Sequence, residues 1–165
     1  MNIDLKKLPK NGKKVNLMFK ECFNNKLFEI SFINGFLHKT KNKYLLNGHL
    51  SFKVNEYCDR CLELYTNEVS DNINLSFVIS PYVTKTLEIK LSDEELDERL
   101  LLDNNLNLVK VLLEEAESLR PIKKLCSLDC KGLCEYCGVN KNIKDCSCNQ
   151  NNKNSFSLGN IIKNR

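Results

Sequence analysis

Residues 126–148 have the sequence Cys126-Ser-Leu-Asp-Cys130-Lys-Gly-Leu-Cys134-Glu-Tyr-Cys137-Gly-Val-Asn-Lys-Asn-Ile-Lys-Asp-Cys146-Ser-Cys148. Six cysteines fall within these 23 residues, and a further pair, in Cys58-Asp-Arg-Cys61, lies far upstream. Thiols separated by one or two residues are typical of tetrahedral zinc sites. Eight thiols therefore predict two four-cysteine zinc sites, one of which must join the middle of the chain to its C-terminal part.

Two divisions of these eight thiols remain open. The first places the last four cysteines in one local site, because closing a loop of 15 residues costs little entropy, and leaves the other four for a second site. The second joins the two Cys-x-x-Cys pairs, as in a zinc ribbon. The first division is favoured, and it gives site 1 as Cys58, Cys61, Cys126 and Cys130, and site 2 as Cys134, Cys137, Cys146 and Cys148.

Length and composition predict a globular protein with a hydrophobic core. The chain has 165 residues, of which 42% are hydrophobic and 28% charged, and this suits one domain with a small zinc-stabilised lobe. We find no run of 18 apolar residues and no signal peptide at the N-terminus, so we expect a cytoplasmic protein. In the reducing cytoplasm, clustered cysteines bind metal more often than they form disulfides. The ninth cysteine, Cys22, is expected to be a small buried hydrophobic residue.

Charge is distributed unevenly along the chain. The formal net charge is +4, but eight thiolates and two Zn²⁺ ions would bring the metal-bound protein close to neutral. Residues 1–20 carry six lysines against one acid, residues 86–120 carry ten acids against four bases, and residues 121–165 are basic again. Global charge therefore gives no argument for nucleic-acid binding, whereas basic ends around an acidic middle predict a dipolar molecule.

Hydrophobic periodicity predicts strands followed by one main helix. Residues 27–37 are rich in aromatic and β-branched residues, and residues 46–55 alternate apolar and polar side chains, so both segments are expected to be strands. A further strand is expected over 65–79, which places Cys58 and Cys61 at the tip of a long hairpin. Residues 15–23 suit either a strand or a helix. A helix is expected over about 107–119, ended by Pro121, with Glu114, Glu115 and Glu117 nearer solvent.

The predicted fold class is α+β. It comprises an antiparallel β-rich domain with a long hairpin and one main helix over 1–125, a cysteine-rich zinc-binding lobe over 126–148, and a loosely ordered basic tail over 149–165.

Catalytic motifs are not found in the sequence. Phosphate-binding loops, nucleophile elbows and metalloprotease helices are missing, and a catalytic zinc usually has a histidine or carboxylate ligand. The two histidines, His38 and His49, are expected at the surface, and the acids of 94–98 are interpreted as a solvated charge run. We therefore predict no catalytic residues and no enzyme activity. A nuclease is disfavoured for the same reason.

Three segments are distinctive in combination. They are Cys58-Asp-Arg-Cys61-Leu62, the helix end Leu119-Arg-Pro121-Ile-Lys-Lys-Leu-Cys126, and Cys130-Lys-Gly-Leu-Cys134-Glu-Tyr-Cys137-Gly-Val-Asn140-Lys-Asn142 with Cys146-Ser-Cys148. Together they resemble the bacterial YceD family, described as the large ribosomal RNA subunit accumulation protein. The resemblance covers roughly residues 44–148. It implies a role in synthesis, processing or stability of 23S ribosomal RNA, and so in biogenesis of the large ribosomal subunit.

Two function classes follow from these observations. The first is a non-enzymatic factor with two structural zinc ions, whose partner is large-subunit ribosomal RNA, a pre-ribosomal particle or a ribosomal protein, with no membrane association. Lysines between ligands can contact phosphates and a tyrosine can stack on bases, and the candidates for RNA contact are Lys131, Tyr136, Lys141 and Lys144. The second is a redox-sensitive zinc protein or chaperone that releases metal on oxidation. An iron–sulfur cluster is a further alternative for four thiolates, but the spacing favours zinc.

Overall fold

The computed structural model describes residues 1–41, 43–79 and 98–148, and the chain divides into two compact units. Unit 1 comprises the described residues of Met1–Asn55 and Thr66–Ile122, and it contains the helix and the main sheet. Unit 2 comprises Glu56–Tyr65 and the described residues from Lys123 onward. The two units are described separately below, and the predicted division at residue 125 stays a prediction.

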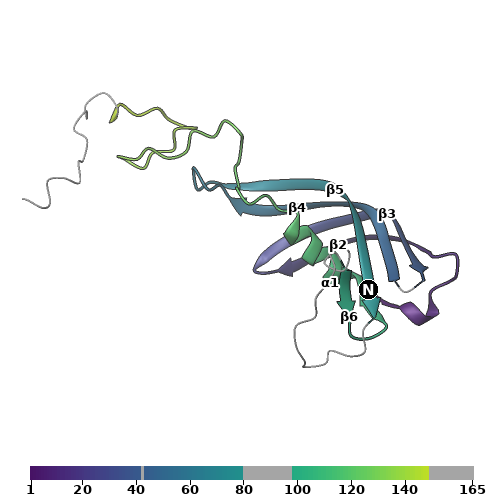
Figure 1. Ribbon diagram of the computed structural model, residues 1–165. Helices are drawn as coiled ribbons and strands as arrows, with labels where there is room; N and C mark the ends of the chain where they lie inside the picture. Colours follow the sequence, from purple (N-terminus) through teal and green to yellow (C-terminus); the bar gives the residue numbers. More distant parts are fainter. Residues whose placement is uncertain (42, 80–97, 149–165) are drawn as a thin grey trace, which may run out of the picture. The chain divides into compact units, whose positions relative to one another are not determined.

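The main sheet has five strands in the order β2-β3-β4-β5-β6 within the described residues (Figure 1). These strands are β2 (Lys13–Phe23), β3 (Lys26–Thr40), β4 (Lys43–Tyr57), β5 (Leu64–Ile79) and β6 (Glu98–Leu101). Pairing is antiparallel between β2 and β3 and between β3 and β4, and parallel between β5 and β6. A second, two-stranded sheet joins β1 (Asn2–Asp4) to β7 (Asn105–Asn107), and a 3₁₀ turn, η1 (Leu5–Lys7), follows β1.

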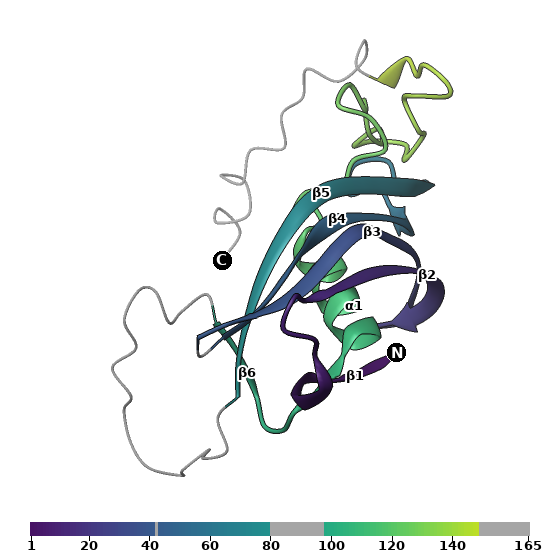
Figure 2. The ribbon, with the colours of Figure 1, turned by 90° about the vertical axis from the view of Figure 1, so that its right-hand side faces the viewer.

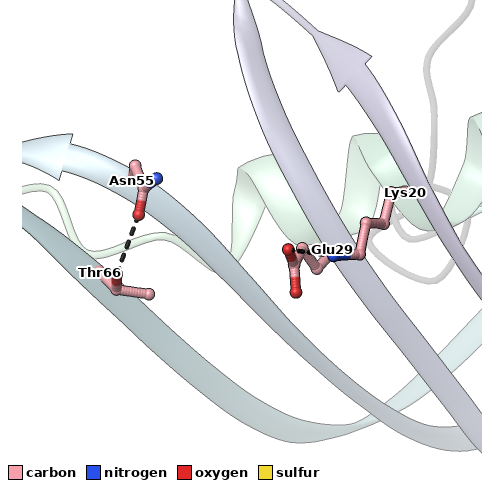
Figure 3. A network of polar contacts seen from close by, with 4 residues as sticks. All are labelled: Lys20, Glu29, Asn55 and Thr66. Atoms are coloured by element: carbon pink, nitrogen blue, oxygen red, sulfur yellow. Dashed lines mark hydrogen bonds and ion pairs between the residues drawn. The ribbon is translucent and has the colours of Figure 1, made fainter.

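Alternation of side chains gives the sheet one apolar and one polar face. In β3, Phe28, Ile30 and Phe32 are buried while Glu29 between them is more accessible. Because successive strand residues point to opposite faces, Glu29 lies on the polar face. There it pairs with Lys20 of the neighbouring strand at 2.6 Å, as Figure 3 shows together with a hydrogen bond between Thr66 and Asn55.

The helix α1 (Leu108–Ser118) packs against the apolar face of the sheet, which curves over it in Figure 2. It begins where the Asn107 side chain accepts a hydrogen bond from the Lys110 backbone N–H at 3.2 Å, which satisfies one of the free donors of the first turn. Its buried residues recur at helical spacing, as expected for an amphipathic helix: Leu108, Val111, Leu112, Leu113 and Ala116.

The sheet differs from the sequence prediction in being mixed instead of antiparallel. Parallel pairing of β5 with β6 requires a connection of a dozen residues or more, and 18 residues separate Ile79 from Glu98 in the sequence. Glu98 begins β6; its side chain is 13% exposed and pairs with Lys43, so for this residue the interpretation as a solvated charge was wrong. The rest of that charge run and the predicted tail over 149–165 fall outside the described residues.

Two further expectations were wrong at single residues. Cys22 is exposed instead of buried, because it lies on edge strand β2, opposite Leu27 near the turn to β3. Glu115 was expected near solvent, but its side chain is 14% exposed and forms an ion pair with Arg99 of β6. In both cases the neighbouring strand, which the local sequence does not specify, decides the environment.

Two glycines provide the space for the Phe32 ring at an irregular part of the sheet. The register of β3 shifts between Ile33 and Phe36. A Cβ atom on Gly48 would lie 2.3 Å from the Phe32 ring, and one on Gly35 would lie equally close to that ring. Phe32 is fully buried, so its ring has little room to move and the core there is sensitive to an added methyl group.

We therefore expect Gly48→Ala to lower the free energy of unfolding by about 1–3 kcal/mol, because the added methyl group overlaps the Phe32 ring. Urea unfolding followed by circular dichroism measures the change. Asn47→Ala, at the exposed neighbouring position, is the matched control and should be nearly neutral. Gly48→Ala with Phe32→Leu should recover part of the loss, and equal stability of Gly48→Ala and the native protein would contradict this account.

Candidate metal centres

Unit 2 brings the eight predicted cysteines together as two groups of four. Within each group the sulfur atoms all lie within 4.8 Å of one another. The groups follow the first of the two divisions considered from the sequence: site 1 contains Cys58, Cys61, Cys126 and Cys130, and site 2 contains Cys134, Cys137, Cys146 and Cys148. Both sites have the donor count of a structural metal site.

The sulfur geometry of site 1 fits a tetrahedral metal ion. The Sγ atoms of Cys58 and Cys130 are 3.7 Å apart, and those of Cys61 and Cys126 are 3.6 Å apart. Four sulfurs at about 2.3 Å from a zinc ion lie about 3.8 Å from one another at tetrahedral angles. The donor set therefore suits a zinc ion that is closed on all four sides, in which the metal would hold the fold and leave no position for a substrate.

The two Cys-x-x-Cys turns share one backbone pattern. In the first, the Leu62 N–H donates to the Cys58 carbonyl at 2.9 Å, and the Cys58 N–H donates to the Glu63 carbonyl at 2.9 Å. In the second, the Gly138 N–H donates to the Cys134 carbonyl at 2.9 Å, and the Cys134 N–H donates to the Val139 carbonyl at 2.8 Å.

Each turn contains a residue with positive φ at the same position. Gly138 has φ +70°, a conformation that glycine adopts readily, and Leu62 has φ +61°. A leucine in this conformation gives no sequence signal, because side chains with a Cβ rarely adopt it.

Backbone contacts hold the first turn against the segment that carries Cys126 and Cys130. The Asp59 N–H donates to the Lys124 carbonyl at 2.8 Å, and the Lys124 N–H donates to the Asp59 carboxylate at 2.7 Å. The Arg60 guanidinium donates to the Cys130 carbonyl at 3.0 Å. These bonds set the four sulfurs of site 1 at their positions without contributing a donor atom to the metal.

Asn142 links the loop of site 2 to a sulfur of site 1. It lies between Cys137 and Cys146, yet its side-chain N–H donates to the Cys130 Sγ at 3.3 Å. Its side-chain oxygen accepts from the Lys131 backbone N–H at 2.8 Å, and Asn140 accepts from the Asn142 backbone N–H at 2.9 Å. Asn142 was not predicted from the sequence as a functional residue, because its only signal was its place in the segment that resembles the family.

Electrostatics in each group favour a mixture of thiolate and thiol until a cation binds. Burial tends to raise the pKa of Cys58, but the backbone N–H groups of Cys126, Cys61 and Arg60 lower it to about 6. The backbone N–H groups of Cys137 and Tyr136 lower the pKa of Cys134, also to about 6.

Other thiols in the same groups have the opposite shift. The hydrogen bond with the Cys61 thiol raises the pKa of Cys126 to about 12, and the hydrogen bond with the Cys137 thiol raises that of Cys148 to about 12. The hydrogen bond with Cys134 raises the pKa of Cys146. The Glu63 backbone N–H lowers the pKa of Cys61, but burial and the neighbouring thiols outweigh it and the net shift is upward.

The residues predicted to contact RNA all lie in unit 2. Tyr136 is inside the second Cys-x-x-Cys turn and its side chain is 58% exposed. Lys131 lies between the two sites and is exposed, as is Lys144, whereas Lys141 is half-buried. His38 and His49 belong to unit 1, and His49 bonds to Ser70 and Asn72 at 2.7 and 3.0 Å.

The fold and the two sites define a class of protein: a mixed β-sheet protein whose second, small unit carries two four-cysteine groups of the structural metal-binding kind. The chain belongs to the YceD family, the large ribosomal RNA subunit accumulation protein, whose family model matches residues 46–158, more than half of the chain. No curated protein and no solved structure matched the chain. Within the described residues, no helix combines the length and apolar character needed to cross a membrane.

For Asn142→Ala we expect one of two bound zinc ions to be held about 10–100-fold less tightly, because the sulfur of Cys130 loses its hydrogen-bond donor. Competition with a chromophoric chelator measures the affinity, and alkylation with mass spectrometry identifies the freed cysteines. They should be those of site 1, although Asn142 lies in the site 2 loop. Ile143→Ala, at a side chain that is 77% exposed, is the control; equal effects of both variants would contradict this role.

Zinc binding should release at least two protons per ion at neutral pH. In site 1 the thiols with raised pKa are Cys61 and Cys126, and in site 2 they are Cys146 and Cys148. A thiol with raised pKa keeps its proton at pH 7, and the metal must displace it, so affinity should rise with pH by about 100-fold per unit for each site. Calorimetry in buffers of different ionisation enthalpy measures the protons, and fewer than two per zinc would contradict the prediction.

Proposed function

We propose that this protein is a non-enzymatic cytoplasmic factor that supports the synthesis, processing or stability of 23S ribosomal RNA, with two structural zinc ions. The observation that carries the proposal is the family match over residues 46–158, which includes all eight grouped cysteines. The family's description names accumulation of the large-subunit RNA. Its partner would be that RNA or a pre-ribosomal particle.

Zinc is the metal that the chemistry of the donor set supports best. Each group offers four sulfurs, and thiolate sites of this kind bind zinc in a closed, tetrahedral form. When bound, the ion would supply charge neutralisation and cross-linking of the chain. The residues around it would orient the sulfurs: Asn142 through its N–H bond to Cys130, and the backbone N–H groups of the two turns.

Direct contact with RNA at unit 2 would use exposed and half-buried side chains near the cysteine groups. Tyr136 presents an exposed ring between Cys134 and Cys137, and an aromatic ring of this kind can stack on an unpaired base. Lys131, Lys141 and Lys144 would contact neighbouring phosphates. These four residues are the proposed RNA contacts of unit 2.

Removal of the protein from its host should lower the ratio of 23S to 16S ribosomal RNA, measured by electrophoresis of total RNA. Wild-type protein should restore the ratio, while Cys130→Ser should fail, because site 1 loses a ligand and a buried sulfur. Cys22→Ser is the matched control, since Cys22 is exposed and lies in neither group. An unchanged ratio after removal of the protein would refute the proposed function.

A further inference from the structure

Unit 1 carries a group of exposed lysines at one end of its sheet, which we call the lysine end. It consists of Lys10, Lys13, Lys14, Lys39 and Lys41, all of which are exposed. They come from two segments of the sequence, residues 10–14, which lead into β2 and begin it, and residues 39–41, at the end of β3 and just after it. The cluster is therefore a product of the fold and not of one basic run.

Strand pairing brings these two segments together. A turn closed by the Gly12 N–H donating to the Pro9 carbonyl at 2.9 Å leads into β2. Lys13 then pairs with Leu37 and Lys14 with Phe36 of β3, and Lys39 follows two residues after Leu37. Since strands lie about 4.8 Å apart and strand residues rise about 3.4 Å, the Cα atoms of Lys13 and Lys39 are about 8 Å apart.

The lysine end has no carboxylate partner in the part of the chain that the structure describes. Elsewhere in unit 1, Lys20 pairs with Glu29 and Lys53 with Glu68, both at 2.6 Å. The ammonium group of Lys39 lies 5.5 Å from the centre of the Tyr44 ring, a contact that leaves its charge unneutralised. Residues 1–41 contain nine lysines against three acids. Asp4 and Glu29 pair with Lys7 and Lys20 and not with the lysine end.

The described part of unit 2, unlike residues 1–41, has no excess of basic side chains. In residues 56–65 and 123–148, six basic side chains are matched by six acidic ones. Eight thiolates with two divalent ions would then leave four negative charges on these segments. Unit 1 as a whole carries 16 basic against 15 acidic side chains, so attraction of a polyanion depends on the placement of lysines at the lysine end and not on a net charge of the unit.

An aromatic side chain accompanies the lysines. The Phe36 ring is 36% exposed, sits opposite Lys14 in the register of β2 and β3, and stacks on His38 with ring centres 5.3 Å apart. Bases of unpaired RNA stack on such rings while lysines bind the phosphates on either side. Acidic proteins offer negative charge but no bases for stacking.

We infer that the lysine end is a phosphate-contact surface for RNA, with Phe36 available to an unpaired base. This inference rests on the proposed function and adds a second, charge-driven contact in unit 1. Lys13 and Lys14 point to opposite faces of edge strand β2, so the surface wraps around this edge of the sheet, and Lys39 and Lys41 extend it across the end of β3. The ligand is recognised through its backbone phosphates, so sequence selectivity is not required of these residues.

The test is binding of fluorescent large-subunit ribosomal RNA fragments to the zinc-loaded full chain over a range of salt concentrations. Lys13→Gln with Lys14→Gln should weaken binding about tenfold or more at low salt and reduce the slope of log affinity against log salt by about 1.4–1.8. Lys20→Gln with Lys53→Gln is the matched control. It removes the same charge from lysines already paired with Glu29 and Glu68, and should change binding less than threefold.

Several outcomes would overturn the inference. Equal weakening by both double variants would show that net charge alone matters, and unchanged binding of the lysine-end variant would place the contact elsewhere. A lysine-end variant that binds RNA normally but no longer co-purifies with a ribosomal protein would assign the surface to protein. If the wild-type chain shows no salt-dependent RNA binding, direct contact fails, while the 23S to 16S ratio in depleted cells still tests the proposed function separately.

Discussion

Four sulfur atoms from two distant segments lie almost in contact, and the whole of unit 2 depends on this arrangement. Cys61 and Cys126 are separated by 65 positions in sequence but by 3.6 Å in space. Thiolates at such distances repel one another strongly, so the group is stable in its ionised form only when a cation lies between them. Backbone N–H groups orient the sulfurs, but they cannot replace the missing positive charge.

The apolar core of unit 2 is too small to hold it together alone. Its buried cluster consists of Cys58, Cys61 and Cys130, with Tyr65 and Leu125 packed against it. Leu128 and Ile143 remain 89% and 77% exposed. A buried apolar cluster of this size rarely stabilises a fold without metals, disulfides or a partner. Unit 1 differs in kind, because phenylalanine and leucine side chains of its sheet and helix fill its core.

Local sequence was sufficient where one segment determines its own structure. The alternation around Phe52 and Val54 indicated β4, and the leucines before Pro121 indicated α1. The cysteine spacing indicated two groups of four, and loop closure favoured the division that the structure has. Parallel β6 and the pairing of β1 with β7 were not predicted, because each is decided by a distant strand. The hydrogen bond from Asn142 to Cys130 was missed for the same reason, since an asparagine in a polar loop has no distinctive pattern.

The separation of the two halves of site 1 has a consequence during translation. At about 5–20 residues per second, Cys126 is synthesised roughly 3–13 seconds after Cys61. For that interval the first Cys-x-x-Cys turn is without the thiols that complete its group. Strand β1 lacks its pairing strand for a longer interval, because its partner β7 begins at Asn105. The nascent chain therefore passes through a stage in which its sheet residues have left the ribosome while two of its thiols are free, exposed to any metal or oxidant that arrives before the chain is finished.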